Sequence, residues 1–172
     1  IVVSGIGKSA IIGMKISSTL NSTGTPSIFM HGSDALHGDL GAITKDDVLI
    51  YISKSGSNSD TVDLVNSLKK NGVDIVSITA NKDSYLAKNS RHIIHTPIHV
   101  EACPNNLAPT TSTGIQLLVG DIIAICLMSL KNFDKISFAK LHPSGSLGKK
   151  LTTTVEDLIA VSYTHLRAHE TS

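Results

Sequence analysis

The stretch from residue 48 to residue 72, VLIYISKSGSNSDTVDLVNSLKKNG, holds a strand, a loop and a helix in one run. Its first five residues are nearly all apolar, which is typical of a central strand covered on both faces. The serine-rich loop 53–59 follows, and then the helical stripe of Val62, Leu64, Val65 and Leu68. We expect this helix over 59–71, because an Asn-Gly pair at 71–72 is a common helix end.

Shorter versions of this pattern recur along the chain. Runs rich in β-branched residues predict five strands, at 1–4, 27–30, 48–52, 75–79 and 91–95. Apolar stripes predict helices at 9–22, 59–71 and 113–130, and the last is apolar on nearly all sides. We therefore expect helix 113–130 to be buried, either in the domain core or against another subunit. The alternation predicts an α/β fold, a doubly wound five-stranded parallel sheet flanked by helices.

The composition fits a single domain and excludes several classes of function. The chain has 172 residues, 41% of them hydrophobic and 17% charged, which is enough apolar material for a core. A net charge of +1 and 3% aromatic residues argue against a nucleic-acid partner. The most apolar run, 122–128, is too short to span a bilayer, so no membrane association is expected. Two cysteines and no visible signal peptide indicate a cytoplasmic protein.

The two ends differ from the middle of the sequence. The chain opens on an apolar run without Met, so we expect it to begin inside a strand. Residues 159–172 have no apolar period and no capping residue, and we interpret them as a non-native or disordered tail. His165 and His169 could share a helix face as metal ligands, but the disordered tail is the favoured interpretation. The domain is therefore assigned to 1–158.

Three polar loops stand where a parallel sheet binds its ligands, beyond the carboxyl ends of the strands. SGIGKS at 4–9 is either an anion-binding turn or a plain tight turn. SKSGSNS at 53–59 gathers four hydroxyls and an amide at a helix start, which favours a phosphate monoester over an ordinary serine cap. APTTST at 108–113 supplies further hydroxyls or only the cap of the last helix.

Five motifs in order resemble one known family. ISKSG is similar to the signature of the sugar-isomerase (SIS) phosphosugar-binding domain. Together with SGIGKSA, STGTPSIFMHGSDALHGDLG, EACPNNLAPTTST and LHPSGSLGKKL, it resembles the arabinose-5-phosphate isomerases of that superfamily, from about residue 2 to 158. The resemblance implies a flavodoxin-like SIS fold and interconversion of D-ribulose 5-phosphate and D-arabinose 5-phosphate through an enediol(ate). That reaction feeds 3-deoxy-D-manno-octulosonate synthesis for lipopolysaccharide or capsule.

The resemblance also implies the functional residues. The family's catalytic positions fall on Lys8, Asp60, Glu101 and His142. Lys8 would steady the enediolate or the phosphate, Glu101 would abstract the proton, and His142 would shuttle a proton. The expected substrate-binding residues are Ser4, Gly24, Thr25, His31, His37, Ser53, Ser55, Ser59, His99, Thr110 and Ser112. His31 is also a candidate ligand for an inhibitory divalent metal ion, and no cofactor is required.

The sequence departs from the family in and after the serine loop. Asp60 stands where the family usually has Glu and is one methylene shorter, so we expect it to orient Lys8 or the sugar. Ser57 replaces an acid, and Lys54 stands where the family often has Asn, which adds a cation near the expected phosphate. His92 and His95 are interpreted as surface or edge residues of the last strand.

Family members are generally tetramers with active sites shared between subunits. We therefore expect a homo-oligomer in which a histidine reaches a neighbour's pocket. Many members continue into a pair of CBS domains, and TVEDL at 154–158 resembles the junction that leads to the first. We interpret the chain as the SIS domain alone.

Two other functions compete with this one. A non-catalytic phosphosugar sensor would keep Ser53, Ser55 and Ser59 but would need neither Glu101 nor His142. The sequence shows no helix-turn-helix or basic patch to accompany such a sensor. An isomerase of another sugar phosphate, such as hexulose 6-phosphate, is opposed by the EACP and HPSG motifs.

Overall fold

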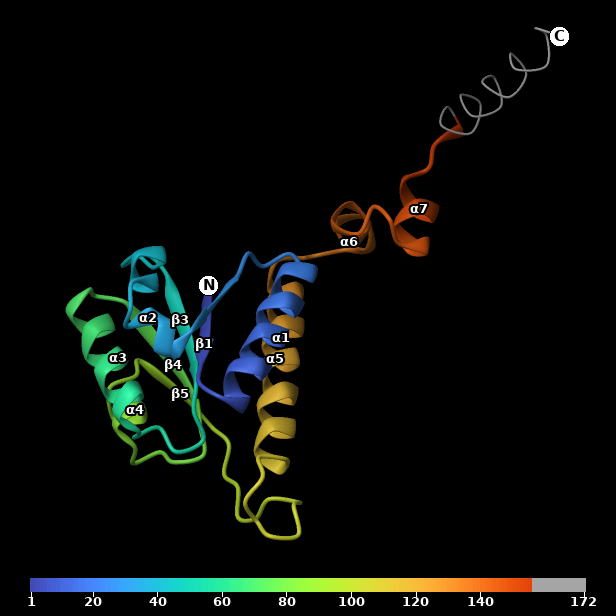
Figure 1. Ribbon diagram of the computed structural model, residues 1–172. Coiled ribbons are helices and arrows are strands. Elements are labelled where there is room, and N and C mark those ends of the chain that lie inside the picture. The colour runs from blue at the N-terminus through green and yellow to red at the C-terminus, as the bar shows by residue number, and fades with distance from the viewer. Residues whose placement is uncertain (156–172) are drawn as a thin grey trace, which may run out of the picture.

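The computed structural model describes residues 1–155, in which strands and helices alternate (Figure 1). The strands are β1 (Val2–Gly5), β2 (Ile28–His31), β3 (Val48–Ile52), β4 (Asp74–Thr79) and β5 (His92–His95). The helices are α1 (Lys8–Ser22), α2 (Gly32–Ala35), the 3-10 helix η1 (Asp39–Ala42), α3 (Ser59–Lys70), α4 (Tyr85–Lys88), α5 (Thr111–Leu130), α6 (Lys135–Leu141) and α7 (Ser146–Thr152). All five predicted strands and the three predicted helices are present. The predicted tail 159–172 with His165 and His169, and most of the 154–158 junction, lie outside the described residues.

The strands form one parallel sheet in the order β2-β1-β3-β4-β5. Gly5 lies opposite Ile52 and Ile52 lies opposite Ile78, so the carboxyl ends of the three inner strands stand level. The predicted doubly wound five-stranded sheet is confirmed, and its strand order is the flavodoxin-like one. Because the winding reverses between β1 and β3, the loops after these two strands diverge and leave room for a ligand between them.

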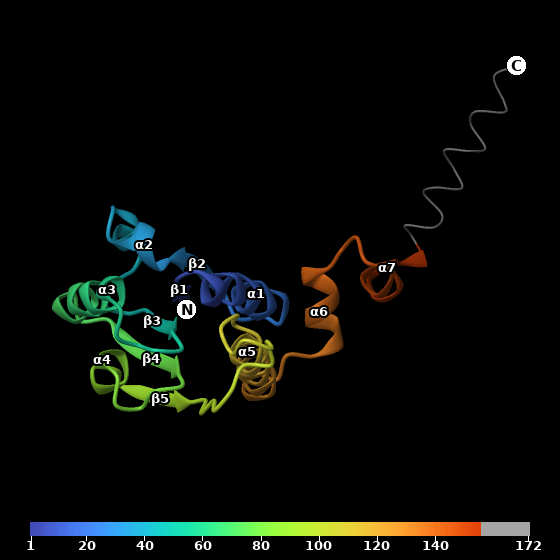
Figure 2. The ribbon, with the colours of Figure 1, turned by 60° about the horizontal axis from the view of Figure 1, so that its bottom comes forward.

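Helices cover both faces of the sheet (Figures 1 and 2). On one face lie α2, α3 and α4, and on the other α1 and α5. Each face has its own apolar core, of which Tyr51, Leu64, Leu68 and Ile75 belong to the first and Val3, Ile16, Ile50 and Ile78 to the second. Burying each such side chain contributes about 1.5–3 kcal/mol. The two cores fix the sheet, and with it the loops at its carboxyl edge.

Helix α5 lies along α1 at the outside of the sheet (Figure 2). Its buried residues recur every four positions and form one narrow stripe of Ser112, Gln116, Gly120 and Ala124. A Cβ atom on Gly120 would overlap the side chain of Ile16, so the glycine lets the two helices approach closely. The closest approach of α1 and α5 therefore uses small and polar residues of α5, while Val119, Ile123 and Leu127 are partly buried against the second core.

The large apolar residues on the outer side of α5 are left in contact with solvent. Leu118, Ile122 and Ile125 are 60%, 50% and 63% exposed. The expected burial of this helix in the domain core is therefore met only in part: Ala124 belongs to the second core and Val119, Ile123 and Leu127 pack against it, but the outer side of the helix stays uncovered. Packing against another subunit is the alternative that remains. Helix α5 has 20 residues and is long and apolar enough to cross a membrane, by length and composition alone. The run 122–128 is only part of this apolar segment.

Candidate active site

The loops after β1 and β3 both start at the carboxyl edge of the sheet, where ligands bind in this strand order. The first loop leads directly into α1, whose N-cap position is Gly7 and has no side-chain cap. The amides of the first turn of α1 are therefore open to an anion. Lys8, the first residue of α1, is exposed at this edge.

Hydrogen bonds hold the serine loop, residues 53–59, in one shape. Gly56 has φ +65, a left-handed conformation that favours glycine, and its amide donates to Ser53 Oγ at 3.0 Å. The Ser57 hydroxyl accepts from the amide of Tyr85 at 3.1 Å, and Ser59 Oγ donates to Asp60 at 3.2 Å. In the described part of the chain Ser55 is exposed and its hydroxyl has no partner, which leaves it available to a ligand.

An amide, not a serine, caps the helix after this loop. Asn58 is the N-cap of α3, and its Oδ1 accepts from the amide of Thr61 at 3.1 Å. The ordinary serine cap that competed with phosphate binding is therefore not what the loop hydroxyls do. Because Asn58 provides the cap, the hydroxyl of Ser55 and the amides at the start of α3 remain available to a ligand.

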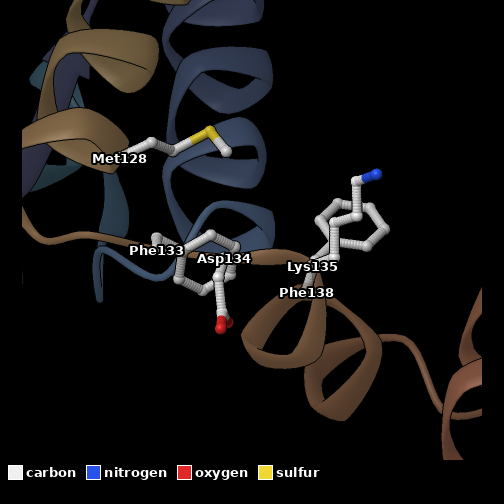
Figure 3. Close-up of a pocket in the computed structure, with 5 residues that line it drawn as sticks. All are labelled: Met128, Phe133, Asp134, Lys135 and Phe138. Atoms are coloured by element: carbon white, nitrogen blue, oxygen red, sulfur yellow. The ribbon is translucent and has the colours of Figure 1, made fainter.

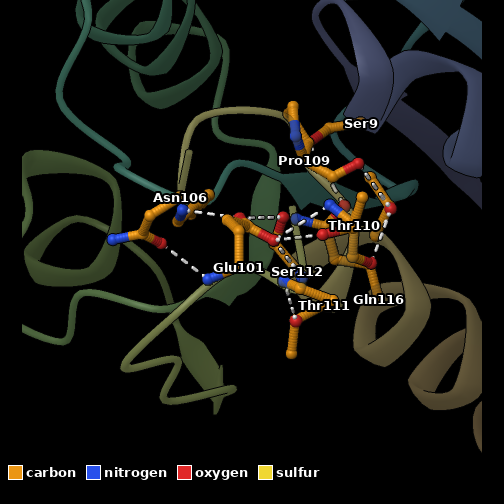
Figure 4. A network of polar contacts seen from close by, with 11 residues as sticks. Ser9, Glu101, Asn106, Pro109, Thr110, Thr111, Ser112 and Gln116 are labelled. Atoms are coloured by element: carbon orange, nitrogen blue, oxygen red, sulfur yellow. Dashed lines mark hydrogen bonds and ion pairs between the residues drawn. The ribbon is translucent and has the colours of Figure 1, made fainter. Parts of the chain in front are cut away.

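Glu101 is the most firmly held side chain of the site (Figure 4). It is 2% exposed, and Oε1 accepts from Lys54 Nζ and from Ser112 Oγ, both at 2.6 Å. Its Oε2 accepts from the backbone amides of Thr110 at 2.9 Å and Ser112 at 3.1 Å. The hydrogen bond from Lys54, followed by those from Ser112 and Thr110, holds the pKa of the Glu101 carboxyl well below its usual range. Glu101 is thus ionised and, in this arrangement, only weakly basic.

Thr110 and Ser112 both donate hydrogen bonds to Glu101, and their expected contact with substrate stays a prediction. Ser112 is 1% exposed, and both residues direct their amides to Glu101. Helix α5 begins at Thr111, two residues earlier than predicted, and this earlier start brings its first amides to the carboxylate. Within this structure both residues hold Glu101, Ser112 from a buried position and Thr110 from an exposed one.

Sequence reasoning missed several supporting residues. The amide of Glu101 donates to Asn106 Oδ1 at 2.7 Å, and the amide of Ala102 donates to Thr111 Oγ1 at 3.0 Å. Ser9 Oγ donates to Oε1 of Gln116, which is 1% exposed, at 3.2 Å (Figure 4). The role of Gln116 could have been predicted from the sequence, because a single amide side chain in an otherwise apolar helix needs a hydrogen-bond partner when it is buried.

The Ser4 side chain lies within the sheet rather than in the loop that follows it. Strand β1 extends to Gly5, so Ser4 lies inside the sheet between β2 and β3. It is fully buried, and its hydroxyl has no hydrogen-bond partner. Contact between the Ser4 side chain and a ligand stays a prediction.

Asp60 and two histidines lie on the α2–α3 side of the carboxyl edge. Asp60 accepts from Ser33 Oγ at 3.4 Å as well as from Ser59, and these bonds hold it on that side. His31 caps α2 by accepting from the amide of Ser33 at 3.3 Å, and His37 is exposed beyond that helix. Among residues 1–155 no group of three His, Cys, Asp or Glu side chains could hold a metal ion, so the metal at His31 stays a prediction.

The histidines of the β5 region are exposed. His92 and His95 are edge-strand surface residues, as predicted, and His95 Nε2 contacts the Ala80 carbonyl at 3.2 Å. His99 lies in the loop that leads to Glu101 and is also exposed. Its contact with substrate stays a prediction.

Helix α6, which His142 follows, lies at the opposite end of the sheet from the loop that joins β5 to α5 and carries Glu101 (Figure 1). His142 stacks on Phe138 with ring centroids 3.9 Å apart, and contacts Ser22 Oγ through Nε2 at 2.9 Å. Ser22 ends α1, which runs back to the amino ends of the strands. One chain therefore does not bring His142 and Glu101 together.

Gly24 and Thr25 share that amino edge. They follow α1, and Lys131 Nζ donates to Thr25 Oγ1 at 2.9 Å and to the Gly24 carbonyl at 3.4 Å. A pocket of about 450 Å³ lies at the junction of α5 and α6, lined by Met128, Phe133, Asp134, Lys135 and Phe138 (Figure 3). Its lining is mostly apolar and contains none of the serine loop, so it does not suit a phosphate.

The comparisons with known proteins agree with this geometry. A family model described as SIS domain matches residues 1–126. Arabinose 5-phosphate isomerase KpsF of Escherichia coli O6:H1 is 49% identical over 159 residues, 92% of this chain and 49% of the relative. Arabinose 5-phosphate isomerase KdsD of Pseudomonas aeruginosa is 47% identical over 161 residues, 94% of this chain and 49% of the relative. The chain thus spans about half the length of these curated relatives.

A solved structure of an Escherichia coli CFT073 protein in complex with arabinose 5-phosphate has the same fold. Its TM-score with this chain is 0.80 at 44% sequence identity, and the match covers 83% of this chain and 76% of that one.

Proposed function

The chain belongs to the SIS domain family, and from that premise we propose that it is an aldose–ketose isomerase of sugar phosphates. The proposed reaction interconverts D-ribulose 5-phosphate and D-arabinose 5-phosphate through an enediolate. The relatives KpsF and KdsD carry the name arabinose 5-phosphate isomerase, which supports this choice of substrate. The aldose product would feed 3-deoxy-D-manno-octulosonate synthesis for lipopolysaccharide or capsule.

One observation carries the proposal: the serine loop and an ionised carboxylate are joined by a single side chain. Lys54 belongs to the serine loop and touches Glu101 at 2.6 Å. A phosphate seated on Ser55 and the amides at the start of α3 would place the sugar beside Glu101. A carboxylate next to the carbons that exchange hydrogen is what an enediolate mechanism needs.

The carboxyl-edge residues divide the proposed work among them. The serine loop would bind the phosphate, Lys8 would stabilise the negative charge of the enediolate, and Glu101 would take the proton next to the carbonyl. Asp60, fixed by Ser33 and Ser59, would orient the sugar. Hydrogen moves between neighbouring carbons of one molecule, so no redox cofactor is required.

The activity is tested by incubating the chain with ribulose 5-phosphate and measuring arabinose 5-phosphate. Glu101→Gln is expected to lower kcat about 10²–10⁴-fold, the usual worth of a positioned base. Asp63→Asn is the matched control, because Asp63 is an exposed acid on α3. Equal rates for wild type and Glu101→Gln would refute the assignment of the base. Phosphosugar binding without turnover by the wild type would favour a sensor, and turnover of a hexulose 6-phosphate alone would favour another isomerase.

We also propose that the chain works as a homo-oligomer, a tetramer with shared active sites. Two features support this: His142 contacts Ser22 at the far end of α1 from the loops of the carboxyl edge, and Leu118, Ile122 and Ile125 of α5 are exposed. A second copy on the outer face of α5 would cover these residues and allow its His142 to approach a neighbour's site. A cytoplasmic location agrees with Cys103 and Cys126, which are free thiols.

Subunit sharing is tested by mixing two inactive variants, Glu101→Gln and His142→Ala. If each site takes Glu101 from one chain and His142 from another, random assemblies regain about a quarter of wild-type activity. Native mass spectrometry would establish that mixed assemblies have formed. Mixed assemblies that stay inactive would refute the sharing of these two residues.

A further inference from the structure

Lys54 connects the serine loop to Glu101 in the loop after β5. Its backbone belongs to the serine loop, where the Lys54 carbonyl accepts from the amide of Ala80 at 3.1 Å and from Thr79 Oγ1 at 3.2 Å. Its side chain crosses to the loop after β5 and ends on Glu101 Oε1 at 2.6 Å. The backbone is therefore fixed, and only the four-carbon stem can move.

Lys54 differs from the other groups that hold Glu101. Thr110 and Ser112 donate from the first turn of α5, and the Ser112 side chain is buried. The side chain of Lys54 is 46% exposed, so it can leave Glu101 without opening the fold. In the described part of the chain it is also the only cation in a salt bridge with Glu101.

We propose that Lys54 changes partner when substrate binds: it pairs with Glu101 in the empty site and turns to the substrate phosphate in the filled one. The inference rests on the proposed function, because it needs a phosphate in the serine loop. A phosphate monoester carries a charge of about −1.5 to −2 at neutral pH, more than one carboxylate, so it competes well for the ammonium group.

The exchange has a direct consequence for the base. With Lys54 present, Glu101 is a poor proton acceptor, and the remaining donors from Thr110 and Ser112 are neutral. When the phosphate takes Lys54, Glu101 loses its one cationic partner and becomes more basic. The charged end of the substrate would thus activate the group that attacks the other end, and a sugar without phosphate would leave Glu101 paired with Lys54.

A binding cycle with a ligand that cannot react tests the exchange. D-arabinitol 5-phosphate is titrated by calorimetry into the wild type, Lys54→Met, Glu101→Gln and the double variant. Lys54→Met is expected to weaken binding about tenfold, and Glu101→Gln to tighten it about three- to tenfold because Lys54 is already released. In the Lys54→Met background the Glu101→Gln gain should largely disappear. A merely structural role for Lys54 does not predict tighter binding by Glu101→Gln.

Controls separate this inference from the isomerase proposal. Lys82→Met removes an exposed lysine from the loop after β4 at the same edge and should bind like the wild type, and Lys54→Arg should keep most of the coupling. D-arabinitol, which lacks the phosphate, should show no difference among the variants. The exchange is refuted if Glu101→Gln does not tighten binding of D-arabinitol 5-phosphate. It is also refuted if Glu101→Gln tightens binding equally in the Lys54→Met background. Wild-type binding without turnover of ribulose 5-phosphate refutes the isomerase while the cycle still decides the role of Lys54.

Discussion

Gly56 determines the shape of the serine loop, and Gly56→Ala is the substitution whose effect the structure defines best. Its φ of +65 costs an L-residue about 1–2 kcal/mol. A Cβ atom there would also stand 2.8 Å from Ser84 Cβ, and such crowding costs about 1–3 kcal/mol. The smaller entropy of the unfolded Ala chain returns about 0.4–1 kcal/mol. We expect a net loss of about 2–4 kcal/mol.

The loop cannot relieve this strain by a small shift. The Gly56 amide is bound to Ser53 Oγ, and its carbonyl accepts from the amide of Leu86 at 2.9 Å. A shift would break one of these bonds and displace Ser55, so affinity for a phosphate ligand should fall together with stability. Thermal unfolding should show a Tm lower by roughly 5–15 °C, at about 2–4 °C per kcal/mol for a chain of this size.

A second substitution separates crowding from backbone strain. Ser84→Gly removes the side chain that the added methyl group of Gly56→Ala would meet, and glycine is tolerated at the N-cap of α4 at a cost of a few tenths of a kcal/mol. Added to Gly56→Ala, it should restore the part of the loss that is due to crowding and leave the part due to φ. A single variant Gly56→Ala with unchanged Tm and unchanged affinity for D-arabinitol 5-phosphate would refute the reasoning.

Three further predictions concern other parts of the chain. Gly120→Ala should lower the free energy of unfolding by about 1–3 kcal/mol, because its Cβ would overlap Ile16. Gly114→Ala in the same helix has open space and should raise the free energy of unfolding by up to about 1 kcal/mol. Urea unfolding measures both changes. The pKa of Glu101 is lower in the folded chain than in the unfolded one, so its contribution to stability is complete above about pH 4.3 and declines as the pH falls further. The urea concentration at the midpoint of unfolding should therefore fall less between pH 6 and pH 3 for Glu101→Gln than for the wild type. Parallel pH curves for the two proteins would contradict this. The backbone amides of Ala108 and Leu107, with those nearby, lower the pKa of the Cys103 thiol, so Cys103 should react with iodoacetamide faster than the more exposed Cys126, as peptide mass spectrometry would show.

The sheet and the serine loop could be predicted because their signals are local. An apolar run such as 48–52 must be covered on both faces, and four hydroxyls before a helix are more than a cap requires. The burial predicted for helix α5 is too deep because periodicity reports which side chains are apolar, not what covers them. Its buried stripe is small and polar, and the large residues Leu118 and Ile125 face outward.

The surroundings of Glu101 could not be predicted from the sequence. The loop between Glu101 and Thr110 turns back through Asn106, whose φ is +53, and only that turn brings the first amides of α5 to the carboxylate. The pairing with Lys54 joins residues 47 positions apart. His142 shows the same limit, because its place at the amino edge depends on where α5 ends and how α6 then lies against α1.

Helix α5 couples two properties that are usually treated apart. Its first turn supplies the amides that fix Glu101, and its outer side carries the uncovered Leu118, Ile122 and Ile125. A small rotation of the helix, such as a neighbour pressing on that side would cause, also turns those amides. The geometry of proton transfer would then depend on concentration: on dilution, turnover should fall before the circular dichroism of the sheet changes.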